Sequence, residues 1–182
     1  MLRFLDIFFS ILGLFLLSPI LVVLYIWGLF DTGSPLFSQQ RVGRNQKPFL
    51  LIKFRTMRLE TETLPTHLVN VSVVTPMGSI LRTSKLDELP QLWNVLKGEM
   101  SLIGPRPCLL NQTEVIFERS SRGLFSFRPG ITGLSQINNI DMSTPKLLAE
   151  TDAEMIYNLT TGNYLKYIFK TILGKGAGDR VK

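Results

Sequence analysis

The 182-residue sequence is poor in cysteine and in histidine, and both shortages exclude kinds of site. Its one cysteine, Cys108, allows neither an internal disulfide nor a cysteine-based metal site. A single free thiol is compatible with a reducing compartment such as the cytosol. The one histidine, His67, stands in a polar stretch, which argues against histidine triads, HExxH zinc sites and histidine relays. If the protein is an enzyme, carboxylates and cationic side chains therefore do its chemistry.

Acidic residues are also scarce relative to basic ones. The chain has 14 Asp and Glu against 20 Lys and Arg, which gives a formal net charge of +6. Such a balance usually indicates binding to nucleic acid or to an anionic membrane surface. The basic residues do not form a stripe with aromatic residues, and the hydrophobic content is concentrated at the N-terminus. We therefore expect a membrane partner and no nucleic acid.

Residues 7–30 contain no charged side chain. At about 1.5 Å per residue, a helix of this length is long enough to cross the hydrocarbon core of a bilayer. The run is too long for a cleaved signal peptide. Pro19, preceded by Ser18, removes the helix hydrogen bond to the carbonyl of Phe15 and predicts a kink or a sharper break. The residues alone favour a spanning helix over one that turns at this point and leaves by the same face.

The densest group of chemically useful residues lies in the middle of the chain. Arg82 precedes an adjacent acidic pair, Asp87 and Glu88, and the rigid turn at residues 104–107 presents Arg106. Carboxylates hold Mg²⁺, and arginines hold the phosphate oxygens that the metal does not reach. The combination suits a site for phosphate and a divalent cation. Taken alone, however, an acidic pair at a helix start is more often a solvated first turn that complements the helix dipole.

Apolar residues at helical spacing follow this pair, and Gly98 ends the helix that they predict. If Ser84 caps that helix, Pro90 lies too deep in it and costs a hydrogen bond. If the helix begins near Pro90, the acidic pair lies at its mouth, where free N–H groups attract phosphate. We favour the second arrangement. Because adjacent residues do not face each other on a helix, Asp87 and Glu88 are expected to have separate roles.

Two short extended segments, residues 38–43 and 49–55, flank a basic turn and predict a pair of strands. In the second segment, Lys53 and Arg55 alternate with apolar residues, so one strand face holds both cations. Such a face suits contact with phosphate, although a solvated strand face is the commoner case.

The second half of the chain predicts mainly helices. Residues 109–122 predict an amphipathic helix with Leu110, Val115 and Phe117 on its inward face. Residues 145–173 are helical in pattern, and their aromatic residues and lysines suit a membrane surface or a core face equally well.

Three less regular segments complete the chain. The Pro-Gly-x-x-Gly turn at residues 129–133 precedes a short predicted strand, and its glycines permit a close backbone approach to a ligand. Residues 59–75 are polar and predict a mobile surface loop. Residues 176–182 predict a flexible tail.

Five segments in this order resemble the small bacterial sugar transferases, the monotopic polyprenyl-phosphate phosphoglycosyl transferases that begin surface-glycan assembly. The resemblance covers nearly the whole chain, and it is specific because the five segments occur together at these spacings. They are the apolar segment with Ser18 and Pro19, residues 51–57 (LIKFRTM), residues 86–98 (LDELPQLWNVLKG), residues 100–107 (MSLIGPRP) and residues 128–134 (RPGITGL).

The resemblance implies an α+β, mainly helical fold in three parts. Residues 1–31 would form a re-entrant helix-break-helix in one leaflet, with the break at Ser18 and Pro19, in place of the spanning helix favoured above. Residues 32–175 would form a compact catalytic domain with interfacial amphipathic helices and a few short strands, on the cytoplasmic face of the bacterial inner membrane. Larger relatives carry further transmembrane helices before the catalytic part, so we expect this chain to be the minimal, single-activity form.

The resemblance also implies a reaction. Asp87 would attack the β-phosphate of a UDP-sugar, release UMP and form an aspartyl-phosphosugar. Polyprenyl phosphate, which is undecaprenyl phosphate in bacteria, would then attack that intermediate to give polyprenyl-diphosphate-sugar. Glu88 would assist the metal or the proton transfer of the acceptor, and Mg²⁺ would be held by Asp87 and Glu88. The residues agree with this chemistry, because a carboxylate is a competent nucleophile and phosphoryl transfer mainly needs charge neutralisation.

Further residues and partners follow from the same resemblance. Lys53 and Arg55 would contact phosphates, and Arg128 with the turn after it would contact the nucleotide. The expected partners are a UDP-sugar carrying an N-acetylated aminosugar, polyprenyl phosphate and membrane lipid, and a homodimer is compatible with them. A non-catalytic, membrane-anchored scaffold for glycan-assembly enzymes is the competing hypothesis. The expected phosphate- and substrate-binding residues are Lys53, Arg55, Arg82, Arg106, Arg128, Pro129, Gly130 and Gln136.

Overall fold

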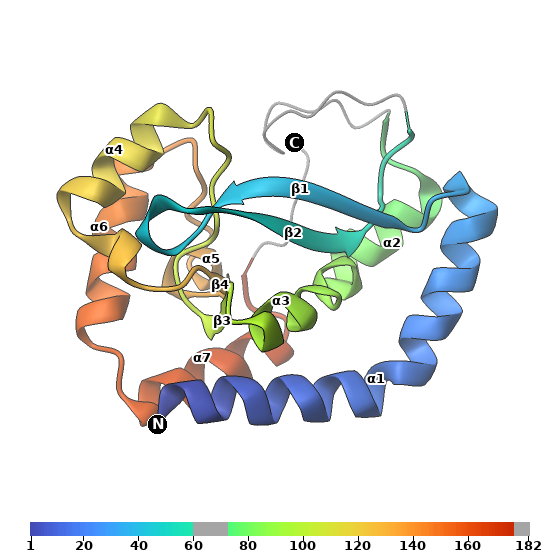
Figure 1. Cartoon of the computed structure of the whole chain (residues 1–182), viewed down its shortest axis with the longest axis horizontal. Coiled ribbons are helices and arrows are strands. Elements are labelled where there is room, and N and C mark those ends of the chain that lie inside the picture. The colour runs from blue at the N-terminus through green and yellow to red at the C-terminus, as the bar shows by residue number, and fades with distance from the viewer. Residues whose placement is uncertain (60–72, 177–182) are drawn as a thin grey trace.

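The computed structural model describes residues 1–59 and 73–176. Within these residues the fold is mainly helical, with a few short strands and a long apolar helix at the N-terminus (Figure 1). The α+β class expected from the sequence is therefore confirmed. Most of the loop predicted at residues 59–75, and all but the first residue of the tail predicted at 176–182, lie outside the described residues.

Helix α1 (Leu2–Thr32) is long and apolar enough to cross a membrane, and most of its side chains are exposed. Figure 1 shows that it changes direction along its length. Pro19 lies inside the helix, as the sequence predicts. The hydroxyl of Ser18 donates a hydrogen bond of 2.8 Å to the carbonyl of Phe15, which is the carbonyl that Pro19 leaves without its helical partner. The side chain beside the proline thus satisfies the polar group that the proline frees.

Both ends of α1 lie against the same folded body. Near its start, Asp6 and Ser10 are buried. Near its end, Leu24 packs in a buried cluster with residues from strand β2 (Pro48–Phe54) and helix α2 (Pro76–Ser84). At Gly28 the helix approaches the chain so closely that a Cβ atom there would lie 2.7 Å from the Cβ atom of Pro35. Exposed apolar side chains nevertheless occur along the whole helix, among them Phe4, Phe15 and Phe30.

Strands β1 (Leu36–Val42) and β2 (Pro48–Phe54) form an antiparallel pair joined by a 3-10 turn, η1 (Arg44–Gln46). This pair confirms the two extended segments predicted from the sequence. The pairing register places Lys53 opposite Phe37. This pairing therefore brings Lys53 close to the ring of Phe37.

Helices α2 (Pro76–Ser84) and α3 (Gln91–Lys97) flank a 3-10 turn, η4 (Leu86–Glu88). Because Ser84 is the last residue of α2, it does not cap α3; Pro90 does, and the helix begins at the next residue. Gly98 ends α3 with φ of 86°, a left-handed conformation that glycine adopts without strain. The arrangement favoured from the sequence is thus confirmed.

Strands β3 (Ser101–Ile103) and β4 (Gly130–Thr132) form a short parallel pair. The predicted order of turn and strand at residues 129–133 is wrong, because the strand lies inside the Pro-Gly-x-x-Gly motif and a short helix, α5 (Leu134–Ile137), follows it. Helix α4 (Thr113–Ser121) and the 3-10 turn η5 (Leu124–Ser126) connect the two strands.

The inward face predicted for residues 109–122 is largely wrong. Val115 is buried, but Leu110 is 47% exposed and Phe117 is 69% exposed. The regular helix is shorter than predicted, since α4 begins only at Thr113, and this leaves Leu110 outside it. A periodic pattern assigns a face only to residues that share the helix.

Residues 145–173 form two helices, α6 (Pro145–Tyr157) and α7 (Thr161–Ile172), and not one helical run. Thr160 separates them, because its side chain accepts a hydrogen bond from the backbone N–H of Asn163 and so starts a new helix. One face of α7 buries Tyr164 and Tyr167 in the main core, whereas Leu165 and Phe169 are exposed. The core-facing role is therefore confirmed for one face, and contact of the exposed face with a membrane stays a prediction.

Candidate active site

The acidic pair of the central stretch is buried. Asp87 and Glu88 lie in the 3-10 turn η4, and they are 1% and 7% exposed. The common alternative of a solvated first turn is therefore wrong for this pair. A carboxylate is costly to bury without polar or charged partners, so the surroundings of the pair indicate what it is for.

Arg106 provides one such partner. Its Nη2 lies 2.8 Å from Oε1 of Glu88, in an ion pair that links the turn after β3 to η4. The sequence places Arg106 and the acidic pair in one stretch, and the structure brings the two side chains together.

A second ion pair, formed by Arg119 and Asp152, is fully buried and contacts the backbone of Arg106. Arg119 of α4 donates to Oδ2 of Asp152 on α6 at 2.7 and 3.0 Å, and the hydroxyl of Ser135 donates to Oδ1 of the same carboxylate at 2.6 Å. Arg119 also donates a 2.6 Å hydrogen bond to the backbone carbonyl of Arg106. A chain of contacts therefore runs from Asp152 through Arg119 and Arg106 to Glu88.

Two further cations lie on the elements that pack around η4. Arg82 of α2 is buried, and its Nε donates a 2.8 Å hydrogen bond to Oγ1 of Thr56, just after β2. Lys53 of β2 is also buried. Helix α2 and strand β2 both pack against η4, which carries Asp87. The two buried cations therefore lie on elements that contact the turn of the acidic pair.

Lys53, in β2, and Arg55, just after the end of β2, lie near the same aromatic ring, as the alternation in the sequence predicts. Nζ of Lys53 lies 5.9 Å, and Cζ of Arg55 lies 5.3 Å, from the centre of the Phe37 ring. The solvated-face alternative is wrong for Lys53, which is buried. Arg55 is held by the chain itself, because its Nε donates a 2.9 Å hydrogen bond to the carbonyl of Ser34. Contact of either cation with phosphate stays a prediction.

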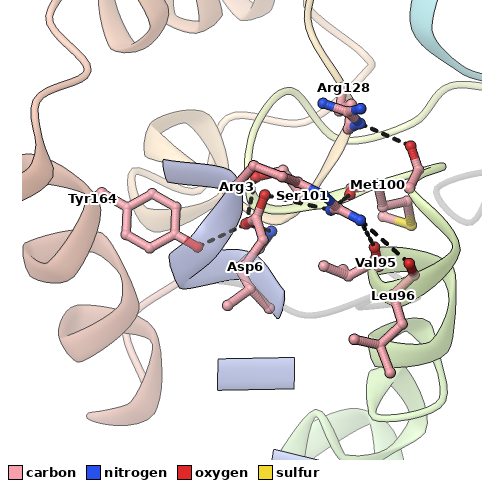
Figure 2. A network of polar contacts seen from close by, with 10 residues as sticks. Arg3, Asp6, Val95, Leu96, Met100, Ser101, Arg128 and Tyr164 are labelled. Carbon is pink, nitrogen blue, oxygen red and sulfur yellow. Dashed lines mark hydrogen bonds and ion pairs between the residues drawn. The ribbon is translucent and has the colours of Figure 1, made fainter. Parts of the chain in front are cut away.

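Arg128 lies in another part of the molecule. Its Nε donates a 2.8 Å hydrogen bond to the carbonyl of Gly98, and burial together with the nearby charges of Arg3 and Arg44 lowers the pKa of its guanidinium. Figure 2 shows it beside the contacts of Arg3. The structure thus groups Arg128 with the start of α1, and its contact with a nucleotide stays a prediction.

Gly130, in the turn predicted to contact the nucleotide, allows two chain segments to approach closely. A Cβ atom at Gly130 would lie 2.1 Å from the backbone nitrogen of Gly104, so any side chain would separate β4 from the turn after β3. This close approach fixes the turn that carries Arg106. The expected ligand contacts of Pro129 and Gly130 stay predictions.

A polar network at the start of α1 escaped the sequence analysis. Oδ1 of Asp6 accepts hydrogen bonds from the hydroxyl of Tyr164 at 2.7 Å, the hydroxyl of Ser101 at 2.8 Å and the backbone N–H of Leu102 at 2.9 Å (Figure 2). Burial and the bond to Asp6 raise the pKa of Tyr164, so its hydroxyl stays a donor. A carboxylate at the edge of an apolar run is costly unless it is paired, and that was the available signal.

Arg3 completes this network. Its guanidinium lies 3.6 Å from Oδ2 of Asp6, and it donates hydrogen bonds to the carbonyls of Val95 at 2.6 Å and Met100 at 3.2 Å (Figure 2). These carbonyls lie at the end of α3 and just before β3. The first turns of α1 are therefore fixed near α3 and β3, the two elements that lie between the acidic pair and Arg106 in the sequence.

The donor set at η4 fits magnesium in part. Mg²⁺ is commonly bound by one or two carboxylates together with substrate phosphates and waters. Asp87 and Glu88 supply two buried carboxylates, and Glu88 is already paired with Arg106. Within residues 1–59 and 73–176, no group of three or more His, Cys, Asp and Glu side chains is placed to hold a metal ion. A metal ion at this pair would therefore need a substrate phosphate or water to complete its ligands.

A cavity of about 310 Å³ adjoins the acidic pair. Glu88 and Gln136 both line it, so the structure brings Gln136, which the resemblance assigns to substrate binding, near the pair. The amide nitrogen of Gln136 donates to the carbonyl of Ile131 at 2.9 Å.

An exposed apolar helix suggests a membrane-associated protein, and a buried carboxylate pair held by arginine forms a site suited to phosphate chemistry. Comparison with known proteins narrows this class. The chain belongs to the bacterial sugar transferase family, whose pattern it matches over residues 1–175. The resemblance drawn from the sequence motifs is therefore confirmed.

Three relatives illustrate the match. The chain is 35% identical over 189 residues to the undecaprenyl-phosphate galactose phosphotransferase of Salmonella typhimurium, across 93% of this chain and 39% of that protein. It is 34% identical over 188 residues to the exopolysaccharide production protein ExoY of Sinorhizobium fredii, across 93% and 83%. It is 42% identical over 108 residues to a putative undecaprenyl-phosphate N-acetylgalactosaminyl 1-phosphate transferase of Bacillus subtilis, across 58% and 60%. The chain spans about two fifths of the length of several curated relatives.

Proposed function

We propose that the protein transfers a phosphosugar from a UDP-sugar to polyprenyl phosphate in two steps. In the first step, a carboxylate oxygen of Asp87 bonds to the β-phosphorus, the bond from that phosphorus to the bridging oxygen breaks, and UMP leaves with the electron pair. In the second step, a phosphate oxygen of the lipid bonds to the same phosphorus and the bond to Asp87 breaks. The products are polyprenyl-diphosphate-sugar and the free carboxylate. The observation that carries this proposal is the buried acidic pair, with Glu88 held by Arg106.

The electrostatics of the site support this chemistry. Transfer of a phosphoryl group is accelerated chiefly by positioning and by neutralising the charge on its oxygens. Arg106 contacts the acidic pair, and Arg82 and Lys53 are buried on the elements that surround it. We infer that these cations hold the diphosphate of the donor. Mg²⁺, held by Asp87 and Glu88, would neutralise further phosphate charge when bound.

The attachment of α1 supports a re-entrant topology. Asp6 fixes the start of the helix to Ser101 and Tyr164, and Gly28 packs against Pro35 near its end. A helix with both ends on one folded body does not place those ends on opposite sides of a bilayer. We therefore infer that α1 dips into one leaflet, and that the folded body lies on the cytoplasmic face of the bacterial inner membrane, where UDP-sugars are made.

The names of the relatives support the substrate classes. They include a galactose and an N-acetylgalactosaminyl 1-phosphate transferase, each named for undecaprenyl phosphate. We infer an undecaprenyl acceptor and a UDP-hexose donor, with an N-acetylated aminosugar as the leading candidate. The first membrane step of a surface glycan is the role that fits these substrates.

The test is release of UMP by the purified chain in detergent with Mg²⁺. A panel of UDP-sugars is compared with and without undecaprenyl phosphate. We expect one donor to give a single-turnover burst of UMP without lipid and continuous release with it. No release from any donor would contradict the proposal and favour the membrane-anchored scaffold.

Replacing Arg106 by alanine is expected to lower kcat/KM by more than about tenfold, which corresponds to about 1.4 kcal/mol of transition-state stabilisation. The change removes the 2.8 Å ion pair with Glu88 and one cation from the site. The measurement is steady-state UMP release beside that of an Arg44→Ala control, since Arg44 lies in the exposed η1 turn. A loss equal to that of the control would mean that Arg106 only shapes its turn.

A cysteine added at the N-terminus is expected to react with a membrane-impermeant reagent only from the cytoplasmic side. A second cysteine, Lys47→Cys in the exposed β1–β2 turn, marks the side of the folded body. The native Cys108 is buried, and burial raises the pKa of its thiol, so it is expected to stay unlabelled. Pro19→Ala restores the bond to the Phe15 carbonyl and is expected to shift some molecules to the spanning form. Labelling of the N-terminal cysteine from outside in the unaltered helix would contradict the re-entrant topology.

A further inference from the structure

The cavity beside Glu88 lies between α7 and the segment that runs from η4 to α3. Leu92 of α3 forms part of its wall, and α1 packs on this leucine, because a Cβ atom at Gly13 would lie 3.1 Å from Cδ1 of Leu92. Ile168 and Ile172 of α7 form another part of the wall. Figure 1 shows α7 beside the first part of α1, with α3 above them. The cavity therefore lies close to the surface that α1 and α7 present.

The walls combine apolar and cationic groups. Seven aliphatic side chains, which include Leu92 and Ile168, line the cavity together with Glu88. Two lysines, Lys85 and Lys175, also line it, and Nζ of Lys85 donates a 2.7 Å hydrogen bond to the carbonyl of Lys175. Apolar walls with basic residues at the rim complement an amphipathic anion.

The route into the cavity is apolar as well. Ile172 lines the cavity and is itself 76% exposed, so the wall continues onto the surface of α7. Leu165 and Phe169 extend this exposed surface along the same helix. A ligand that reaches the cavity along α7 therefore stays in contact with apolar side chains, as a lipid does and a sugar nucleotide does not.

We infer that this cavity binds the phosphate-bearing end of the polyprenyl phosphate acceptor. The first isoprene units would pack on Leu92 and Ile168, and the phosphate would lie near Lys85, Lys175 and Glu88. At about 310 Å³ the cavity is at the small end of ligand pockets, so the remaining chain would stay in the bilayer along α1 and α7. The inference rests on the proposed transferase function, and it assigns the acceptor to a place distinct from the cations on α2 and β2.

The assignment is tested by filling the cavity. Ile168→Trp is compared with Leu147→Trp, which makes the same kind of change at an exposed residue of α6 that does not line the cavity. Three readouts are taken for each: the burst of UMP without lipid, KM for the UDP-sugar, and KM for undecaprenyl phosphate in detergent micelles. The burst and KM for the UDP-sugar report folding and the donor site, and KM for the lipid reports the acceptor site.

We expect Ile168→Trp to keep its burst and to raise KM for undecaprenyl phosphate by about tenfold or more, the size of effect that shape changes in an apolar pocket have on discrimination. Leu147→Trp should change none of these quantities. An unchanged KM in Ile168→Trp would overturn the assignment. A raised KM for the UDP-sugar instead would also overturn it, because the cavity would then hold the donor.

A second pair of variants decides the matter if Ile168→Trp fails to fold. Lys175→Glu places the opposite charge at the cavity, and Lys166→Glu makes the same change on α7 away from the cavity. Only the first is expected to raise KM for the lipid, by about threefold, as for an exposed charge pair. Equal effects would overturn the assignment.

Failure of the proposed function is distinguished by the unaltered protein. If it releases no UMP, binding of undecaprenyl phosphate in micelles is measured directly. Weaker binding by Lys175→Glu than by Lys166→Glu would still support a lipid site in the cavity. Equal binding by both would overturn it.

Discussion

Asp87→Asn is expected to abolish turnover, while the protein folds and binds its donor. An amide is a far weaker nucleophile than a carboxylate, so the first bond to phosphorus does not form. The two side chains have nearly the same shape, and this matters because Asp87 is almost completely buried. Steady-state release of UMP should fall to background, and so should the single-turnover burst without lipid.

The control for this variant is Asp141→Asn, which makes the same chemical change in the loop before α6. Oδ1 of Asp141 accepts hydrogen bonds from the backbone N–H and the hydroxyl of Ser143, in the turn before α6. This variant is expected to keep turnover within about twofold, because surface changes usually alter stability by less than about 0.5 kcal/mol. In the unaltered protein, mass spectrometry of the burst sample should find phosphosugar on the peptide that contains Asp87.

Two outcomes would contradict the nucleophilic role. Turnover near normal in Asp87→Asn would remove Asp87 from it outright. A burst that disappears while continuous release persists would mean that the lipid attacks the donor directly, without a covalent intermediate. Glu88 would then remain as a group that orients Arg106, since their ion pair does not depend on the covalent step.

The sequence predicts local elements well where a single residue type decides the geometry. Pro90 and Gly98 fix the ends of α3, and the alternation around Lys53 predicts that Lys53 and Arg55 point to the same side. Pro19 predicts the disturbed part of α1. In each case the cause is a backbone restriction or a strand period, and neither depends on distant parts of the chain.

Burial and long-range pairing could not be predicted in the same way. The common reading of Asp87 and Glu88 as a solvated turn fails because α2 and β2 cover them, and only the tertiary structure shows this. Asp6 meets Tyr164 across 158 positions, and Arg119 meets Asp152 across 33. No periodic pattern links such partners, so the groups that hold the site together remained hidden although the acidic pair itself was identified.

The pair formed by Arg119 and Asp152 gives the second large expected effect. Asp152→Ala should lower the free energy of unfolding by about 3–5 kcal/mol, because it leaves a buried guanidinium without its carboxylate. Arg119 and Asp152 are 2% and 1% exposed in their side chains, so water cannot replace the lost partner. The measurement is denaturant or thermal unfolding of the whole chain in detergent, with the midpoint as the readout.

The matched control lies on the same helix. Glu150→Ala removes a carboxylate that is 49% exposed and lies 3.4 Å from Arg122, a surface pair whose loss usually costs about 1 kcal/mol or less. Equal midpoints for Asp152→Ala and Glu150→Ala would contradict the buried pair as a major source of stability. The double variant Arg119→Met, Asp152→Leu should recover much of the lost stability, because it removes both charges together.

The double variant also separates stability from positioning. Arg119 donates its 2.6 Å hydrogen bond to the carbonyl of Arg106, and methionine cannot replace that donor. Even with its stability recovered, the double variant should therefore have a lower kcat than the unaltered protein, because Arg106 is held less firmly against Glu88. A double variant that recovers both stability and kcat would show that the turn after β3 holds Arg106 without help from α4. The close contact of Gly130 with Gly104 would then be sufficient to position it.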